Sequence, residues 1–281
     1  MRRSKPDQLL KDTMMTNIKV KDMPEGAVPI VTSSGDIEIP ESYLKPMERK
    51  EIGVDFYLNR SHPSDRYKNL LEEYILMHRV SNGMFNGRSL GKWTDIIHGF
   101  IDKLNCKTLL DYGSGKGHLY TDKFNTILDA NGLAVLDKPL PEIWTNLESY
   151  RLFDPAYEEF QELPEGKFDA VISTDVMEHI PETDLLWVID EILGYANKMV
   201  FLNIACFQAI KTLADGSNAH VSVFHHLDWL ELLAARFNNH KHLAVYVFFD
   251  LFNSAGKMTE KGFKISMGEK DIRVIELQEV E

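Results

Sequence analysis

The sequence predicts an α/β fold built on a doubly wound, mostly parallel sheet, and three observations support this prediction. The chain has 281 residues, of which 44% are hydrophobic and 26% charged, a composition typical of a globular protein with a large core. From residue 107 onward, short apolar runs of strand length alternate with segments whose apolar residues recur at helical spacing. A glycine-rich turn directly follows the first of these runs. In such sheets ligands bind outside the carboxyl ends of the strands, so we look for function there.

The pattern divides the chain into three parts. Residues 1–60 hold several prolines and scattered charges without a sustained period, so we expect an extended or partly disordered segment. Residues 61–105 predict helices that cover the site. Residues 106–281 carry the alternation of strands and helices and predict the ligand-binding domain.

Two helices are expected before the first strand. Apolar residues follow helical spacing from Tyr67 to Ile75, and Ser64 or Asp65 can cap the start of this helix. A cleaner stripe runs from Trp93 to Leu104. A turn rich in glycine and asparagine, residues 81–91, joins the two helices.

The remaining elements alternate in type. A helix is expected along the apolar stripe from Leu185 to Leu193, and another over Asp228–Phe237, where Asp228 and Glu231 stand at capping-box spacing. The expected strands are Lys107–Tyr112, Tyr150–Asp154, Phe168–Ser173, Met199–Ala205, Leu243–Phe249 and one or two within Gly262–Leu277.

Cysteine usage and hydropathy indicate the compartment. Cys106 and Cys206 each lie in or beside an apolar run, which predicts two buried thiols in a reducing compartment rather than a disulfide framework. No apolar run is long enough for a transmembrane helix, and charges interrupt the basic start of the chain where a signal peptide needs an apolar core. We therefore expect a cytoplasmic protein without a membrane partner.

The charge balance bears on the partner. The net charge is −12, from 31 Lys and Arg against 43 Asp and Glu. A protein that grips a phosphate backbone usually carries a basic face, and no run of this sequence is dense enough in Lys and Arg to predict one. The sequence thus disfavours nucleic acid and favours a small-molecule substrate. The oligomeric state has no signature in the sequence.

The most informative stretch is the glycine turn after the first strand, Asp111-Tyr112-Gly113-Ser114-Gly115-Lys116-Gly117. Closely spaced glycines let the backbone turn sharply and leave no Cβ between main chain and ligand. The dinucleotide fingerprint is G-x-G-x-x-G, which places a pyrophosphate at a helix N-terminus, but its sixth position here is His118. Asp111 supplies a carboxylate at the end of the strand.

This turn resembles the first motif of class I S-adenosylmethionine-dependent methyltransferases. The segment Phe168-Asp-Ala-Val-Ile-Ser-Thr-Asp175-Val-Met-Glu-His-Ile180 is similar to their fourth-strand motif, in the DVLEHI form of enzymes that act on small molecules. The two motifs stand in the right order, and the resemblance covers about residues 92–250. It implies a Rossmann-like methyltransferase fold in which residues 106–281 bind S-adenosylmethionine and release S-adenosylhomocysteine.

The resemblance also implies which residues bind the cofactor. The acid after the second strand would hold the ribose hydroxyls, because one carboxylate can accept from two adjacent hydroxyls. The acid and valine after the fourth strand would border the transferable methyl group. The implied cofactor-binding residues are Asp111, Gly113, Ser114, Gly115, Lys116, Gly117, Asp154, Asp175 and Val176.

The chain departs from the family in its spacing. Between Gly117 and Asp154 lie 36 residues, more than a helix and a strand usually need, and we expect Tyr120 and Trp144 of this insertion to cover the substrate. Only 13 residues separate Asp154 from Phe168, which leaves little room for a third strand. Two acids, Glu159 and Glu162, remain open as the adenine contact. Two other aromatic residues, Trp93 and Trp229, are expected in the core.

Two histidines are the candidate catalytic residues. His220 ends the loop Asp215-Gly-Ser-Asn-Ala-His after the fifth strand, and an imidazole there could orient or deprotonate a substrate hydroxyl. The alternative is an ordinary Asp-Gly turn. His179 lies just before Pro181, where it could line the site, as the resemblance implies, or merely pack against a helix start.

Two further patterns carry less weight. His220, His225, His226 and Asp215 could form a metal ligand set, but adjacent histidines point apart in any regular element, so we assign no metal site. Asp154-Pro-Ala-Tyr157 superficially resembles a DNA amino-methyltransferase motif, yet that motif belongs after the fourth strand. A strand that ends in a proline turn is the simpler interpretation.

The sequence thus predicts an S-adenosylmethionine-dependent methyltransferase that methylates an oxygen, nitrogen or carbon of a small molecule. Two alternatives stay open. One is a protein that binds S-adenosylmethionine without catalysis, because a fold alone does not prove activity. The other is a nicotinamide-dependent oxidoreductase on a related fold, whose sixth-position glycine and following acid are not seen here.

Overall fold

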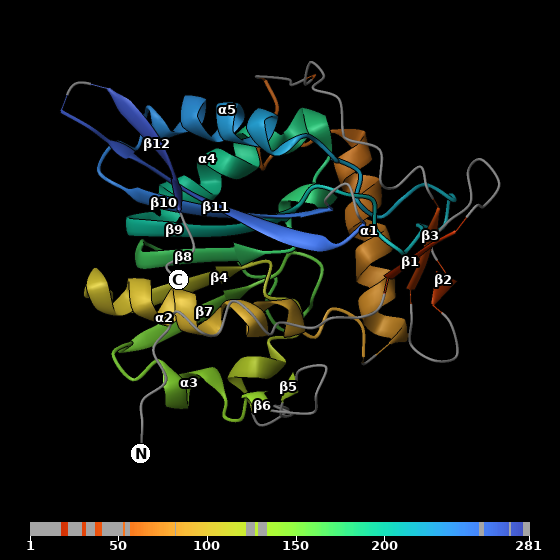
Figure 1. Ribbon diagram of the computed structural model, residues 1–281, viewed down its shortest axis with the longest axis horizontal. Coiled ribbons are helices and arrows are strands. Elements are labelled where there is room, and N and C mark those ends of the chain that lie inside the picture. Colours follow the sequence, from red (N-terminus) through yellow and green to blue (C-terminus); the bar gives the residue numbers. More distant parts are fainter. Residues whose placement is uncertain are drawn as a thin grey trace.

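A seven-stranded sheet forms the centre of the protein in the computed structural model, which describes residues 18–21, 30–31, 37–40, 53, 57–81, 83–121, 127–128, 134–252, 256–269 and 271–277. The strands lie in the order β12-β11-β10-β9-β8-β4-β7 (Figure 1). In chain order their bounds are β4 Thr108–Tyr112, β7 Ser149–Phe153, β8 Phe168–Thr174, β9 Ala196–Ala205, β10 Ala244–Phe252, β11 Met258–Met267 and β12 Ile272–Leu277.

Five neighbouring strands of this sheet, β7, β4, β8, β9 and β10, are parallel, and the hairpin of β11 and β12 continues the sheet with antiparallel pairs. From β4 the chain passes to β7 on one side and then to β8 on the other side, so the strand order reverses at β4. Such a reversal is the switch point at which open α/β sheets bind ligands. The predicted α/β fold with a mostly parallel sheet is confirmed.

Helices cover both faces of the sheet, because alternate residues of its strands are apolar on both sides. Leu110 packs in the cluster that includes α4 (Leu185–Tyr195) and α5 (His226–Phe237). Its neighbour Leu109 packs in the opposite cluster, with α2 (Thr94–Lys103). Parallel strands buried on both faces read as continuous apolar runs, which is why the sequence marks them clearly.

The aromatic residues expected in the core lie there. Trp93 is 1% exposed and Trp229 is fully buried. The expectation that Tyr120 and Trp144 cover the substrate is wrong: both are buried in the α2-side cluster, and the Trp144 indole donates to the carbonyl of Thr94 at 3.2 Å. Their segment packs against the face of the sheet instead. It contains the 3₁₀ helix η4 (His118–Tyr120), β5 (Ile127–Leu128), β6 (Ala134–Leu136) and α3 (Leu140–Ile143).

The helix α1 (Asp65–Val80) lies across the carboxyl ends of the parallel strands (Figure 1). Ser64 caps it as predicted, since its hydroxyl accepts from the backbone N–H of Tyr67 at 3.0 Å. Of the helices expected over residues 61–105, only α1 lies over this end of the sheet. The second expected helix is divided into the 3₁₀ helix η3 (Arg88–Trp93) and α2, and it packs on the face of the sheet.

A fully buried carboxylate fixes the start of α1. Asp184, at the N-terminus of α4, accepts from the backbone N–H of Ser64 at 3.0 Å and from the hydroxyl of Ser64. It also accepts from the indole of Trp187 at 2.8 Å and the hydroxyl of Thr183 at 3.0 Å. One side chain thus joins the two helices and satisfies four donors.

Arg60 adds a second attachment just before α1. Its Nε donates to one carboxylate oxygen of Glu191 in α4 at 2.8 Å, and its Nη2 donates both to the other carboxylate oxygen and, at 2.7 Å, to the Tyr112 hydroxyl. The guanidinium also lies over the Trp187 ring, 4.9 Å from its centroid. Such a bidentate and stacked arrangement requires arginine rather than lysine.

Two further expectations differ from the structure, one in the N-terminal segment and one at the start of α5. Within residues 1–60, where the sequence predicts no regular structure, three strands pair into a small sheet: β1 (Ile18–Lys21), β3 (Ile37–Pro40) and β2 (Ile30–Val31). The helix α5 begins at His226, and the His225 side chain rather than Asp228 caps it, by accepting from the backbone N–H of Leu227. No helix in the described part of the chain could span a membrane.

Replacing the carboxylate that joins α1 to α4 is expected to destabilise the fold. Asp184→Ala leaves buried donors of Ser64 and Trp187 without an acceptor, at a cost of about 2–4 kcal/mol in the free energy of unfolding. Denaturant titration followed by circular dichroism measures this loss. Asp137→Ala, which removes an exposed carboxylate, is the matched control and should change the free energy by less than about 0.5 kcal/mol. Equal effects of the two substitutions would contradict the role given to Asp184.

Candidate functional site

A cavity of about 440 Å³ opens at the carboxyl ends of β4, β7, β8 and β9. Its floor comes from the first residues after these strands, and its roof comes from one side of α1 and the loop of residues 207–220. The volume lies in the range of small-molecule sites, and most of the lining is apolar. The roof residues from α1 are Tyr67, Leu70, Leu71, Tyr74, Met77 and His78.

The glycine turn follows β4 as predicted, and its glycines are required by their backbone conformation. Gly113, Gly115 and Gly117 have φ angles of +83°, +57° and +58°, a region that other residues seldom adopt. A Cβ on Gly113 would meet the Val176 side chain at 2.3 Å, and one on Gly115 would meet the Phe85 carbonyl oxygen at 2.2 Å. The missing side chains therefore let the protein pack closely against its own turn.

Only part of the turn faces the cavity. Gly113 and Gly115 line it, whereas Asp111, Ser114, Lys116 and Gly117 are not among its lining residues. Lys116 instead borders a neighbouring cavity of about 510 Å³ and donates to the carbonyl of Ser81. The backbone of residues 85–87 holds the turn from outside: Lys116 N–H donates to Phe85 at 2.7 Å and His118 N–H donates to Asn86 at 3.1 Å.

Asp154 lies directly after β7 and lines the cavity, where the ribose-binding acid was predicted. One of its oxygens accepts from Gly115 N–H at 2.9 Å, and the other accepts from Ala156 N–H at 2.9 Å. Burial raises the pKa of this carboxyl group to about 6, although these backbone donors oppose the shift. Asp154 thus ties the glycine turn to the next strand and presents a carboxyl group to the cavity.

Asp111 is almost fully buried beneath the turn, on the same face of β4 as Leu109. Burial raises the pKa of its carboxyl group to about 7, and the neighbouring Tyr120 hydroxyl offsets part of this shift. The nearby Asp154 raises it further. Asp111 is not among the residues that line the cavity, so its contact with the methionine end of a cofactor stays a prediction.

Asp175 follows β8 on the cavity floor, and its backbone has an unusual left-handed conformation. Its φ angle is +55°, a conformation that asparagine and aspartate tolerate better than other residues with a side chain. The side chain is exposed in the cavity that it lines. Surrounding protein and the carboxylate of Asp250 raise its pKa, while Lys92, which binds Asp250 at 2.7 Å, opposes the shift. Strained polar residues of this kind occur often at functional sites.

The two candidate catalytic histidines lie together at the cavity wall. Their rings meet edge to face with centroids 4.9 Å apart. Burial and the neighbouring His220 lower the pKa of His179 to about 3, and burial also lowers the pKa of His220. Both imidazoles are therefore neutral near pH 7. A pKa of about 3 leaves His179 poorly matched to proton transfer at neutral pH, because transfer is most efficient when the pKa lies near the working pH.

Three polar residues of α1 at the cavity were not assigned a role from the sequence: Tyr67, Tyr74 and His78. His78 lies between two rings, with its centroid 4.9 Å from Phe85 and 5.3 Å from Tyr157. Burial and the nearby Lys116 lower its pKa to about 4. The signal was present in the sequence, since tyrosine and histidine interrupt an apolar stripe at helical spacing. Because the polar ends of such side chains need partners, they could have predicted that this face of the helix borders a cavity.

Several residues considered from the sequence lie elsewhere. Glu159 and Glu162, the candidate adenine contacts, are not among the residues that line the cavity. Asp215 is exposed and pairs with Arg66 of α1 at 3.0 Å, which joins the loop of residues 207–220 to α1. The histidines of the possible metal ligand set lie apart: His225 caps α5, His226 stacks on the Phe263 ring, and neither lines the cavity with His220.

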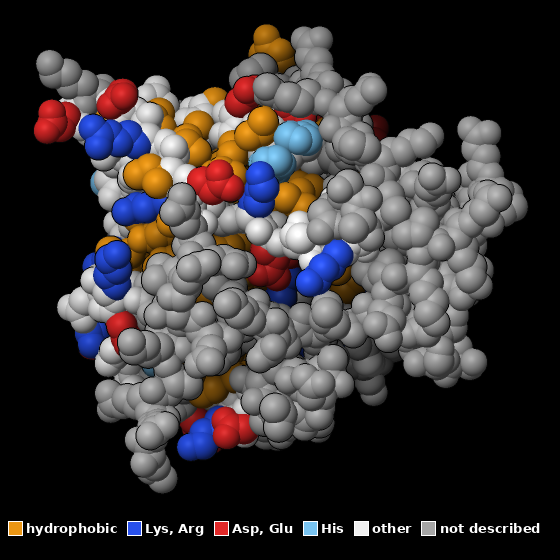
Figure 2. Space-filling view, viewed as in Figure 1, with side chains coloured by type: hydrophobic (Ala, Val, Ile, Leu, Met, Phe, Trp, Pro, Cys, Tyr) orange, Lys and Arg blue, Asp and Glu red, His pale blue; other side chains and the backbone are white. Residues whose placement is uncertain are grey.

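The visible charges show no continuous basic surface. On the face in Figure 2, Lys and Arg side chains are scattered among acidic and apolar ones across the described residues.

Comparisons with known proteins add no family to this description. No protein-family model matches the chain, and a search of curated proteins finds no similar sequence.

The tight contact of the turn with residue 85 can be tested by adding one methyl group. Gly115→Ala places a Cβ against a backbone oxygen at a left-handed position, and we expect the free energy of unfolding to fall by about 2–4 kcal/mol. Gly166→Ala is the matched control: its φ is +79°, but a Cβ there meets nothing within 4 Å, so a loss of about 1 kcal/mol is expected. Denaturant titration compares the two. Similar losses would show that conformation alone explains the glycine at position 115.

The buried Asp111 predicts a pH dependence of stability. Its folded-state pKa of about 7 exceeds the ordinary value of 3.8, so its contribution is complete below pH 4 and is lost as the pH rises through 7. Between those limits the wild type loses up to about 1.4 kcal/mol of unfolding free energy per pH unit, and Asp111→Asn should remove this loss. The variant should gain stability relative to the wild type from pH 4 to pH 8 in urea titrations. Parallel curves for the two proteins would refute the shift, and the exposed Asp95→Asn serves as control.

Proposed function

We propose that the protein is an S-adenosylmethionine-dependent methyltransferase that acts on a small-molecule acceptor. One observation carries the proposal: a single cavity at the switch point of the sheet brings together the glycine turn, the acids after β7 and β8, and the two histidines. The two sequence motifs that resemble class I methyltransferases each contribute lining residues to this cavity, after β4 and after β8.

The residues of the cavity fit the chemistry of this cofactor. A sulfonium and an amino group carry positive charge, and Asp154 and Asp175 are carboxyl groups in mostly apolar surroundings, where electrostatic attraction is strong. Asp154 would hold the ribose hydroxyls, with the backbone of Gly113 and Gly115 beside it. Asp175 and Val176 would border the reacting methyl group. The bound cofactor supplies an electrophilic methyl group on a good leaving group.

The protein's own part in the reaction is mainly to position the acceptor and exclude water. Transfer forms a bond from the acceptor atom to the methyl carbon and breaks the bond from that carbon to sulfur, which leaves a neutral thioether. An acceptor hydroxyl or amine also releases a proton, and His220 is the better proton acceptor of the two histidines. The apolar roof from α1 keeps water away and aligns the two reactants.

Two other functions remain in competition. A protein that binds S-adenosylmethionine without catalysis would use the same acids and the same turn, but it would need no imidazole in the acceptor region. A nicotinamide-dependent oxidoreductase would need room for a pyrophosphate against the turn, whereas the turn packs on the backbone of residues 85–87. Methyl transfer measured over a panel of metabolites distinguishes catalysis from binding alone.

Cofactor binding is tested by isothermal titration with S-adenosylmethionine and with S-adenosylhomocysteine, which lacks the sulfonium charge. We expect equimolar binding of both. Asp175→Asn keeps a residue that tolerates the left-handed backbone but removes the charge. This substitution should weaken the binding of S-adenosylmethionine by about tenfold, equivalent to about 1.4 kcal/mol, and weaken the binding of S-adenosylhomocysteine much less.

The control is Asp137→Asn, which alters an exposed carboxylate outside the cavity and should leave both affinities unchanged. Absence of binding of both ligands to the folded wild-type protein would refute the proposed function. Equal weakening of the two ligands by Asp175→Asn would refute the position given to the sulfonium.

A further inference from the structure

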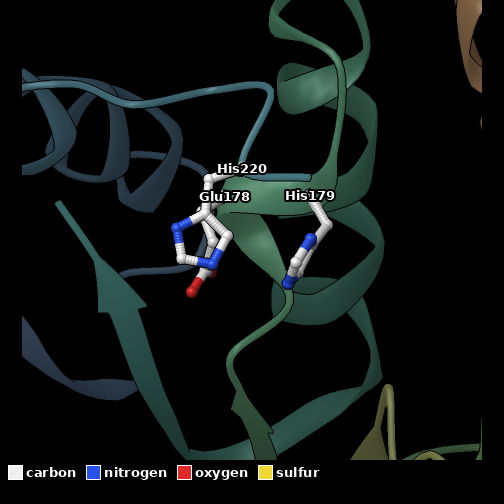
Figure 3. A group of neighbouring side chains, drawn as sticks. All are labelled: Glu178, His179 and His220. Carbon is white, nitrogen blue, oxygen red and sulfur yellow. The ribbon is translucent and has the colours of Figure 1, made fainter. Parts of the chain in front are cut away.

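Three side chains with metal-binding atoms converge at the cavity wall (Figure 3). Glu178 and His179 belong to the 3₁₀ helix η5 (Met177–His179), directly after β8, and His220 comes from the loop after β9. One nitrogen or oxygen of each residue lies within 4.8 Å of the others. In the view of Figure 3, the Glu178 carboxyl group lies beside the His220 ring, with the His179 ring across from both.

Backbone carbonyls fix the orientation of both imidazoles. The Nδ1 of His179 lies 2.8 Å from the Ala219 carbonyl oxygen, and the Nδ1 of His220 lies 2.6 Å from the Phe207 carbonyl oxygen. Because a carbonyl only accepts, the Nδ1 of His220 carries the hydrogen and its Nε2 keeps the lone pair. The Nδ1 of His179 has the same carbonyl contact, with the Tyr74 hydroxyl also 2.8 Å away, and donation to Ala219 leaves the lone pair on Nε2 here too. Histidines that bind metals have this arrangement: the second ring nitrogen donates to a carbonyl or carboxylate.

Glu178 supplies an independent reason to expect a cation. Its side chain is fully buried, and Oε1 accepts from the Ala205 backbone N–H at 3.1 Å. Oε2 has no hydrogen-bond partner among the described residues. A buried carboxylate oxygen without a donor is costly, and the carboxyl group of Asp175 nearby adds like charge. A bound cation would give this oxygen a partner and stabilise the ionised form of the carboxyl group, which burial disfavours.

We propose that Glu178, His179 and His220 bind a divalent first-row transition-metal ion, with open coordination positions toward the cavity. Two imidazoles and one carboxylate form a donor set suited to Zn²⁺ or Fe²⁺ rather than to Mg²⁺ or Ca²⁺, which prefer oxygen ligands. Sites with three protein ligands leave room for water or substrate. The histidines line the cavity, so that room lies where the acceptor would bind.

The consequence for the acceptor rests on the proposed methyltransferase function. Metal binding uses the Nε2 lone pairs, so neither histidine would then accept a proton. A metal-bound hydroxyl loses its proton more readily, which would replace a histidine base and favour acceptors with an oxygen nucleophile. The metal site itself stands without this step, since it depends only on the three side chains.

The test uses the full chain with any affinity tag removed, stripped with a chelator, and no S-adenosylmethionine present. Calorimetric titration with Zn²⁺ should give one ion per chain, and Co²⁺ should give a visible absorption spectrum of nitrogen and oxygen ligation. Glu178→Gln and His220→Asn should each weaken Zn²⁺ binding by at least about tenfold. Each should also reduce the rise in unfolding temperature that the ion causes. His242→Asn, which removes an exposed imidazole, should bind as the wild type does.

Circular dichroism of the metal-free variants verifies that they fold. Anomalous diffraction from wild-type crystals soaked in Zn²⁺ needs no variant, and it should place the ion in bonding distance of all three side chains. The proposal is overturned if the folded wild type binds no equimolar ion, if both variants bind as it does, or if the ion lies elsewhere. If the protein binds the metal ion but not S-adenosylmethionine, the proposed methyltransferase function is refuted and the metal site stands.

Discussion

The cavity depends on one constraint, the attachment of α1 to α4, which holds α1 over the carboxyl ends of the strands. The sheet alone would present the carboxyl ends of its strands to solvent. Asp184 holds the first residues of α1 against α4, and Arg60 binds Glu191 just before the helix begins. At the roof, Arg66 pairs with Asp215 of the loop, and Tyr74 lies 2.8 Å from His179 Nδ1. Because these contacts join one helix to three separate segments, the roof and walls form a unit.

The same attachment sets the electrostatics of the cavity. The roof of α1 surrounds the rings of His78 and His179 with protein, and burial lowers the pKa of each, which favours the neutral imidazole. Asp175 is exposed within the cavity, but the protein around it and Asp250 raise the pKa of its carboxyl group. A cationic ligand or ion would restore the charge of the acids and leave the imidazoles neutral. Among the described residues, the charged side chains that line the cavity are the two acids Asp154 and Asp175 and the cation Lys211.

The glycine turn shows how one sequence signal can have two physical causes. Closely spaced glycines predict a close approach of the backbone, and the approach is found. The partners are the side chain of Val176, the carbonyl of Phe85 and the side chain of Leu152, so the turn meets the protein itself at each glycine. Gly113 and Gly115 still border the cavity. Sequence alone does not distinguish a ligand from a neighbouring segment, because both require only the absence of a Cβ.

By itself, the sequence determined the features that arise from local patterns. The apolar strands, the amphipathic helices, the Ser64 cap and the turn after β4 all follow from the preferences of residues within a few positions of one another. Tertiary structure alone decided that Tyr120 and Trp144 enter the core, and that His220 meets His179 and Glu178 rather than His225. His220 lies 41 positions after His179, and Tyr120 and Trp144 lie far in the sequence from the α2 residues they pack against, so only the packing of the sheet and its helices brings them together.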